Sequence, residues 1–151
     1  MNLWIDTGAL HSAGKMIQAK VSEMTADVDR KILSRGTRVV NELRNSELEV
    51  LRGERSGRTY RVPYSKKTYT ASAPGEPPAR RTGNLRLHWN GNVEEQHAGP
   101  GIKLKAVLES GEEYAAYLEN GTRTMAPRPF VDRIVEKAMP GIKRIMEEPY
   151  K

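Results

Sequence analysis

The feature that most constrains the fold is a long helical pattern in the first third of the chain. Apolar residues recur there at steps of three, four or seven, and mostly charged residues lie between them: Ile17, Val21, Met24, Val28, Ile32, Val39 and Leu43. This spacing predicts an amphipathic helix with one apolar stripe over residues 9–52. A helix of about 40 residues is about 60 Å long, which exceeds the width of a 17.0 kDa globule. The element must therefore bend back or extend onto a neighbouring subunit.

The weakest point of this helical pattern is Gly36, because a glycine inside a helix costs roughly 1 kcal/mol relative to alanine. We expect either a single bent helix or two helices that meet near Gly36. A sustained amphipathic stripe favours oligomerisation, although packing within one subunit accounts for it equally well.

The positive charge of the chain is concentrated in its next segment. The net charge is +6, and residues 52–86 carry nine basic and two acidic side chains. Prolines and glycines predict a long, largely irregular loop over residues 53–83, in which residues 58–62 and 67–70 pair as short strands. Such a segment faces phosphate, an acidic protein surface or solvent. The side chains that we expect to contact DNA or a partner are Arg55, Arg58, Arg61, Lys66, Lys67, Arg80 and Arg81.

Alternating patterns predict strands after this loop. Residues 85–96 and 102–108 alternate apolar and polar side chains, which predicts an antiparallel hairpin broken by residues 97–101. Residues 112–119 are predicted as a short helical turn, closed by Gly121. The sequence therefore places a small antiparallel sheet in the second half of the chain.

The last element is predicted as a helix that starts at Pro129. Its apolar face comprises Phe130, Ile134, Ala138, Ile142 and Ile145. Pro140 lies inside this pattern, and an internal proline removes one hydrogen bond and kinks a helix. We expect a helix kinked near Pro140 or a second helix that begins there.

Together these patterns predict an α+β fold in a single domain of 151 residues. Its parts are a helical arm over 1–52, a basic loop over 53–83, and a sheet with a C-terminal helix over 84–151. We expect the C-terminal helix to pack on the sheet.

The side chains needed for chemistry are absent or scattered. The chain has no cysteine, and its three histidines lie in different predicted elements, whereas a metal site needs clustered ligands. We expect no catalytic, cofactor-binding or metal site, and a protein that is not an enzyme. The sequence contains no run of about 18 apolar residues, which a membrane-spanning helix needs. We therefore expect the protein to lie in the cytoplasm.

Two passages in the second half carry recognisable motifs. Residues 114–122 read Tyr-Ala-Ala-Tyr-Leu-Glu-Asn-Gly-Thr, and Pro-Arg-Pro-Phe follows at 127–130. Residues 71–79 read Ala-Ser-Ala-Pro-Gly-Glu-Pro-Pro-Ala, and Thr-Gly-Asn-Leu-Arg follows at 82–86. These passages resemble the signature of a family of neck and tail-completion proteins of tailed bacteriophages, found in lambdoid phages and their prophages.

The resemblance implies a virion structural protein that forms a homo-oligomeric ring, expected to be a hexamer, in the neck or at the head-proximal end of the tail. The implied partners are a head-closure or adaptor protein, the tail tube or the tail terminator protein, and genomic DNA in the channel. The implied location is the virion, and the host cytoplasm during assembly. A tail terminator ring is the alternative role within the same class.

The structural signature comprises Tyr114, Tyr117, Glu119, Gly121, Thr122, Arg128, Pro129 and Phe130. We expect the aromatic side chains to lie in the core and to hold the last helix onto the sheet. Glu119 is expected to pair with Arg128 and lock this corner, or alternatively to meet a basic group of the next subunit.

Sequence-independent nucleic-acid binding is the rival function. The basic segment interleaves its cations with Tyr60, Tyr64 and Tyr69, and this combination suits phosphate contacts and base stacking. No recognition helix or aromatic RNA-binding motif accompanies it. The charge therefore predicts only attraction without sequence preference.

Overall fold

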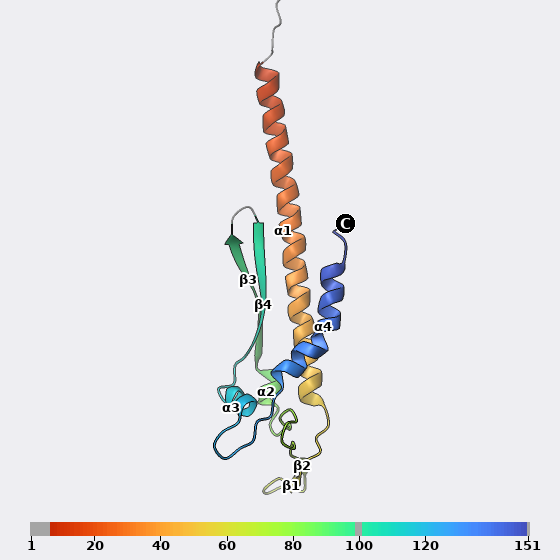
Figure 1. Ribbon diagram of the computed structural model, residues 1–151, viewed down its shortest axis with the longest axis vertical. Coiled ribbons are helices and arrows are strands. Elements are labelled where there is room, and N and C mark those ends of the chain that lie inside the picture. The colour runs from red at the N-terminus through yellow and green to blue at the C-terminus, as the bar shows by residue number, and fades with distance from the viewer. Residues whose placement is uncertain (1–6, 99–100, 151) are drawn as a thin grey trace, which may run out of the picture.

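The fold is organised around one long helix. The computed structural model describes residues 7–98 and 101–150, and α1 (Thr7–Arg52) is a single helix of 46 residues. It is therefore about 69 Å long, and its N-terminal part extends well beyond the other elements (Figure 1). The alternative of two helices meeting at Gly36 is wrong, because the helix runs through this residue without a break.

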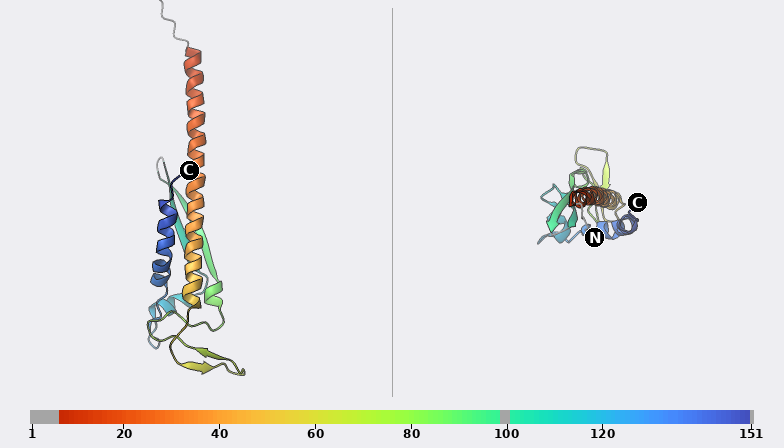
Figure 2. Two further views of the ribbon diagram at one scale, coloured as in Figure 1. Left: turned by 90° about the vertical axis from the view of Figure 1, so that its right-hand side faces the viewer. Right: turned by 90° about the horizontal axis from the view of Figure 1, so that it is seen from above.

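A β-hairpin lies along one side of the C-terminal part of α1 (Figure 2). Its strands β3 (Trp89–Ala98) and β4 (Gly101–Ser110) pair antiparallel, with Trp89 opposite Ser110. Glycines allow the close approach: a Cβ on Gly36 would lie 3.0 Å from side-chain atoms of Leu104 and Val93, and one on Gly91 would collide with Val40.

The predicted hairpin is confirmed, but its ends are corrected. Pairing continues through His97, Ala98 and Gly101, so the expected break at 97–101 is wrong for these three residues; residues 99 and 100 of that prediction lie outside the described part of the chain. Residues 85–87, predicted as strand, belong instead to the helical turn α2 (Asn84–Leu87). Gly83 causes this, because its φ of 95° turns the chain and its carbonyl accepts the first helical hydrogen bonds.

The C-terminal helix α4 (Val131–Glu147) packs against the other side of α1 (Figures 1 and 2). Ile134, Ala138 and Ile145 are buried, which confirms the predicted apolar face. The helix continues through Pro140, so a second helix starting there is wrong and the predicted kink is not confirmed. Its main support is α1 and not a sheet, contrary to expectation.

The remaining elements form the base of the molecule. The short strands β1 (Thr59–Arg61) and β2 (Thr68–Thr70) pair antiparallel as predicted, and α3 (Ala115–Asn120) is the expected helical turn. The fold is α+β, with long N-terminal and C-terminal helices and two separate two-stranded antiparallel sheets in place of one.

The core lies where the base meets the end of α1. Leu51, Leu85, Phe130 and Ile134 form one buried cluster, and the Trp89 ring packs edge-on against Phe130 at a centroid distance of 6.1 Å. Further along α1, Val40 is also buried. We call residues 32–52 the covered half of α1, because the hairpin and α4 flank it, and residues 7–31 the projecting half.

Candidate functional site

The two passages that carry the family resemblance bind each other. The Arg128 guanidinium donates to the Ser72 carbonyl at 2.6 Å and to the Ser72 hydroxyl. The Gly75 amide donates to the Pro127 carbonyl at 3.2 Å, and Arg133 donates to the Gly75 carbonyl at 2.8 Å. We call this set of contacts the clasp. It ties residues 72–75 to the start of α4, although more than 50 residues separate them.

Glu76 extends the clasp to the residues that follow α1. Its carboxylate accepts hydrogen bonds from the Ser56 amide at 3.1 Å, from the Ser56 hydroxyl, and from the Ala73 amide at 2.9 Å. The Ser56 hydroxyl, followed by the two amides, lowers the pKa of Glu76 to about 2. The carboxylate is therefore ionised throughout the neutral range, and it holds the proline-rich loop in a fixed turn.

Glu119 stabilises the start of α4. Its carboxylate accepts hydrogen bonds from the Phe130 amide at 2.8 Å and the Val131 amide at 3.3 Å. A carboxylate at this position satisfies amides that lack a helical partner and interacts favourably with the helix dipole. The expected pairing with Arg128 is wrong, because that arginine binds Ser72. Glu119 therefore fixes this corner of the chain, but it does so by capping the start of α4 and not by pairing with an arginine.

The other signature residues divide between core and surface. Phe130 is 1% exposed, as predicted, whereas Tyr114 is 39% and Tyr117 62% exposed, which corrects their expected place in the core. Gly121 has φ of 76° and ends α3. Thr122, which is exposed, forms a tight turn through its amide and the Met125 carbonyl at 2.8 Å.

A groove of about 740 Å³ runs between these two passages. Apolar and basic side chains share its lining, which includes Tyr69, Arg81, Leu85, Arg86, Leu118 and Arg128. Two residues of the structural signature, Tyr114 and Arg128, therefore face the same concave surface as residues 78–86.

Arg55, predicted to contact DNA or a partner, has a structural role. Its guanidinium donates to the carbonyls of Val50 at 2.9 Å and Gly53 at 2.7 Å, which terminate α1, and to that of Pro78 at 3.1 Å. Burial lowers the pKa of Arg55 from its usual value. This side chain is already occupied by backbone acceptors.

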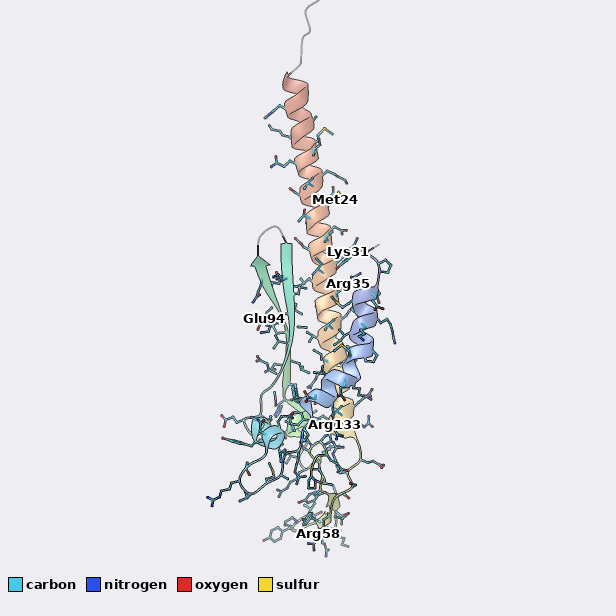
Figure 3. All side chains as sticks on the ribbon, in the orientation of Figure 1. Met24, Lys31, Arg35, Arg58, Glu94 and Arg133 are labelled. Atoms are coloured by element: carbon cyan, nitrogen blue, oxygen red, sulfur yellow. The ribbon has the colours of Figure 1, made fainter. Side chains whose placement is uncertain are left out.

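The remaining predicted cations lie in two places at the base. Arg58, Arg61, Lys66 and Lys67 are exposed on the β1–β2 hairpin, at the opposite end of the molecule from the projecting half (Figure 3). Arg58 lies 5.6 Å from the Tyr60 ring centroid, and Tyr60 stacks on Tyr69 at 5.7 Å. Arg80 and Arg81 are exposed on the groove, so the structure does not gather the predicted cations into one patch.

The covered half of α1 contains a buried carboxylate that the sequence analysis did not predict. Glu47 is 0% exposed, and its Oε2 accepts from Arg44 at 2.8 Å. Burial raises the pKa of Glu47 to about 7, against the opposing charges of Arg44 and Arg86. Glu47 Oε1 and Arg86 Nε are buried without a hydrogen-bond partner in the described part of the chain. No sequence signal separates Glu47 from the exposed Glu49.

Sequence reasoning also missed Ser72, Glu76 and Arg133 of the clasp. The first two lie in a passage that carries the resemblance, and this position was the available signal. No sequence signal pointed to Arg133, because the helical pattern assigns it to the solvent-facing side of α4.

The apolar stripe of α1 is bare over the projecting half. Ile17, Val21, Met24 and Val28 are 65%, 56%, 60% and 44% exposed. Met24 lies beyond the ends of the hairpin and α4 (Figure 3). This is the most extended exposed apolar surface on α1.

No family model, curated protein or solved structure matches this chain. Within residues 7–98 and 101–150, no helix has both the length and the apolar character needed to cross a membrane. The same described residues contain no group of three or more His, Asp or Glu side chains placed to hold a metal ion.

Proposed function

We propose that this protein is a structural component of a tailed-bacteriophage virion that forms a ring in the neck or at the head-proximal end of the tail. The observation that carries the proposal is the clasp. The two passages that resemble the phage family are distant in sequence, yet Arg128, Ser72 and Gly75 bind them together. A resemblance restricted to two unrelated surface loops would lack this physical connection.

The shape of the subunit supports assembly with further copies. Its long helix leaves five large apolar side chains exposed on the described part of the projecting half, Met16 among them, and exposed apolar surface of this kind marks interaction sites. A ring requires heterologous contacts whose rotation closes. An elongated subunit with different surfaces at its two ends suits such a ring.

In this proposal six copies surround a channel, and the ring completes the tail and joins it to the head. One face binds a head-closure or adaptor protein, and the other binds the tail tube or the tail terminator protein. A terminator ring is the alternative placement. The subunit acts by assembly and not as an enzyme, first in the host cytoplasm and then in the virion.

The test is the mass of the purified protein by light scattering at several concentrations and salt levels, followed by mixing with tails that lack it. The expected result is a discrete ring, or a monomer that forms one on the tails and makes them competent to join heads. A protein that stays monomeric and ignores both heads and tails overturns the proposal.

The clasp gives a matched pair of variants for the joining assay. Arg128→Ala removes the contacts with Ser72, whereas Arg123→Ala removes an exposed arginine from the neighbouring turn. We expect Arg128→Ala to reduce tail joining and Arg123→Ala to leave it unchanged. If both variants join tails to heads equally well, the clasp is not needed for assembly.

Sequence-independent nucleic-acid binding is the second candidate, and the β1–β2 hairpin favours it. This hairpin combines four exposed cations with Tyr64, whose side chain is fully exposed at the turn. Phosphate contacts make affinity fall steeply with salt, with a slope of about −0.9 per phosphate on duplex DNA. The test is duplex binding by the wild type and by Lys66→Glu/Lys67→Glu. Steep salt dependence that the double variant loses supports this function, whereas no binding at low salt excludes it.

A further inference from the structure

The spacing of the exposed apolar residues on the projecting half is that of a coiled-coil seam. From Ile17 to Val21, Met24 and Val28 the steps are four, three and four, so Ile17 and Met24 are seven positions apart, as are Val21 and Val28. This repeat matches the a and d positions at which helices interlock along a narrow seam. A helix that covers a broad globular surface carries a wider apolar stripe.

The seam continues a stripe that the chain itself covers lower down. Ile32, Val39 and Leu43 prolong it into the covered half, where they are partly buried beside the hairpin and α4. The exposed part stops at Lys31, which takes the next d position and pairs with Asp27 at 2.7 Å. Lys31 lies near the level at which the hairpin and α4 end (Figure 3). The bare seam therefore begins where internal cover stops.

A shallow hollow of about 430 Å³ marks this boundary. Val21, Met24, Val28 and Ile32 form its α1 side, and Ile102 at the start of β4 closes it. The hollow lies along the helix and is continuous with the seam. It has the position needed to receive the side chains of a second helix running beside α1.

The charges beside the seam are compatible with a second identical helix. Lys20 pairs with Glu23 at 3.0 Å, and Asp27 pairs with both Arg30 and Lys31. Residues 11–31 carry four basic and three acidic side chains, so copies of this segment do not repel strongly. The apolar repeat has its best complement in a helix with the same repeat, which every copy supplies.

We propose that the projecting halves of α1 from several copies of this chain associate in parallel, as a coiled-coil bundle through Ile17, Val21, Met24 and Val28. The parallel direction rests on the proposed function, because rotation about a ring axis gives every copy of α1 the same inclination to that axis, so copies that pack side by side along it run in the same direction. Each copy thereby removes from water the surface that its own body leaves bare.

Single-cysteine crosslinking tests the seam, since the chain has no cysteine of its own. Ile17→Cys and Val28→Cys place thiols near its two ends, and Ala26→Cys places one on the opposite, exposed side of the helix. With a short bifunctional thiol reagent we expect covalent dimers for the first two variants and background levels for Ala26→Cys. The full-length protein is used throughout.

The pattern of crosslinks also reports direction. Antiparallel helices would join Ile17→Cys to Val28→Cys in a mixture of the two variants while leaving each alone uncrosslinked, and this result overturns the parallel bundle. Absence of crosslinks in every combination overturns the seam itself.

A charge variant provides the second readout. Val21→Asp buries a carboxylate in the proposed bundle, and Ala26→Asp adds the same charge on the opposite side. Because an unpaired buried charge costs several kcal/mol, we expect Val21→Asp to raise the concentration for half-assembly more than about tenfold. Ala26→Asp should leave it unchanged, and equal effects would refute the seam.

The two proposals fail in different ways. A ring that joins heads to tails but gives no crosslinks refutes the bundle and leaves the proposed function standing. A crosslinked assembly that neither binds tails nor joins heads supports the bundle and refutes the neck function.

Discussion

The two halves of α1 carry the same apolar repeat but have different surroundings. In the covered half, residues such as Val40 and Leu51 are buried by the rest of the chain, whereas in the projecting half Ile17, Val21 and Met24 remain exposed. A helical pattern in a sequence therefore identifies a surface that needs cover, but not whether the same chain or another one supplies it. We therefore expect the covered half to contribute most of the stability of the subunit, and in the proposed assembly the projecting half supplies contacts between copies.

The largest expected difference comes from truncating one apolar side chain in each half. Leu51→Ala leaves a cavity beside Phe130 and Ile134, and we expect it to lower the free energy of unfolding by about 3 kcal/mol. Ile17→Ala should change it by less than about 0.5 kcal/mol, as for exposed sites. Urea denaturation of dilute, monomeric protein measures both values. Equal losses would mean that the projecting half is covered within the monomer.

Carboxylates in the two halves are expected to respond to pH in opposite directions. The pKa of Glu47 is raised from 4.5 to about 7 by burial, so the folded state binds this proton more tightly than the unfolded state. Its contribution makes stability fall as pH rises from about 4.5 to about 7, with a slope of at most about 1.4 kcal/mol per pH unit. The check is denaturation at several pH values, in which Glu47→Gln should show a smaller decline.

Asp27 in the projecting half is the control for this effect. The hydrogen bond from Lys31 lowers the pKa of Asp27, so its contribution to stability is present at neutral pH and is lost only as pH falls into the acid range. Asp27→Asn should therefore keep the decline between pH 5 and 7. If Asp27→Asn abolishes the decline in stability between pH 5 and 7, that decline does not come from Glu47.

Two glycines allow the same substitution in both halves. A Cβ on Gly14 meets nothing within 4 Å, whereas one on Gly36 lies 3.0 Å from Leu104 and Val93. Alanine gains about 1 kcal/mol of helix propensity at either site, but only Gly36→Ala crowds the hairpin. We expect Gly14→Ala to retain more helix than the wild type as the temperature rises, and Gly36→Ala to lower the temperature at the midpoint of unfolding. Circular dichroism measures both effects. An equal gain at both sites would show that the hairpin packs loosely.

The smallest effect is expected at the upper edge of the covered half. Arg38 donates two hydrogen bonds to Glu148, at 2.5 and 2.6 Å, just after α4 ends. Both side chains are partly exposed, and such pairs add little to stability and weaken in salt. Arg38→Ala should therefore destabilise the protein less than Gly36→Ala does, and the loss should shrink in 1 M salt. A large, salt-independent loss would assign the effect to packing of the arginine side chain.

The sequence predicted elements with strong periodicity well. The long helix, both hairpins, the turn before Gly121 and the apolar face of α4 follow from spacing and glycine placement. Leu85 and Leu87 misled the prediction because three alternating residues suit a strand and a short helix equally. The conformation of Gly83 decided between them, and it is not visible in the spacing.

The site was less predictable, because its contacts depend on which segments meet. Glu119 was correctly expected to lock the corner, but backbone amides compete with Arg128 for a carboxylate, and only the geometry shows which are closer. Arg55 was counted among the available cations because it lies in the basic segment, yet carbonyls at the end of α1 bind it. Similarly, the burial of Glu47 depends on which segments pack against the end of α1, among them α2, whose Arg86 lies near this carboxylate.

The unbroken length of α1 makes the subunit a fixed spacer. Hydrogen-bonded helix does not stretch, so the 46 residues of α1 set a span of about 69 Å between the base and the free end. Insertion or deletion of seven residues within the projecting half would shift that end by about 10 Å while keeping the apolar repeat in phase. In the proposed ring, the distance between the partners bound at the two ends of the subunit would therefore be set by the number of residues in α1.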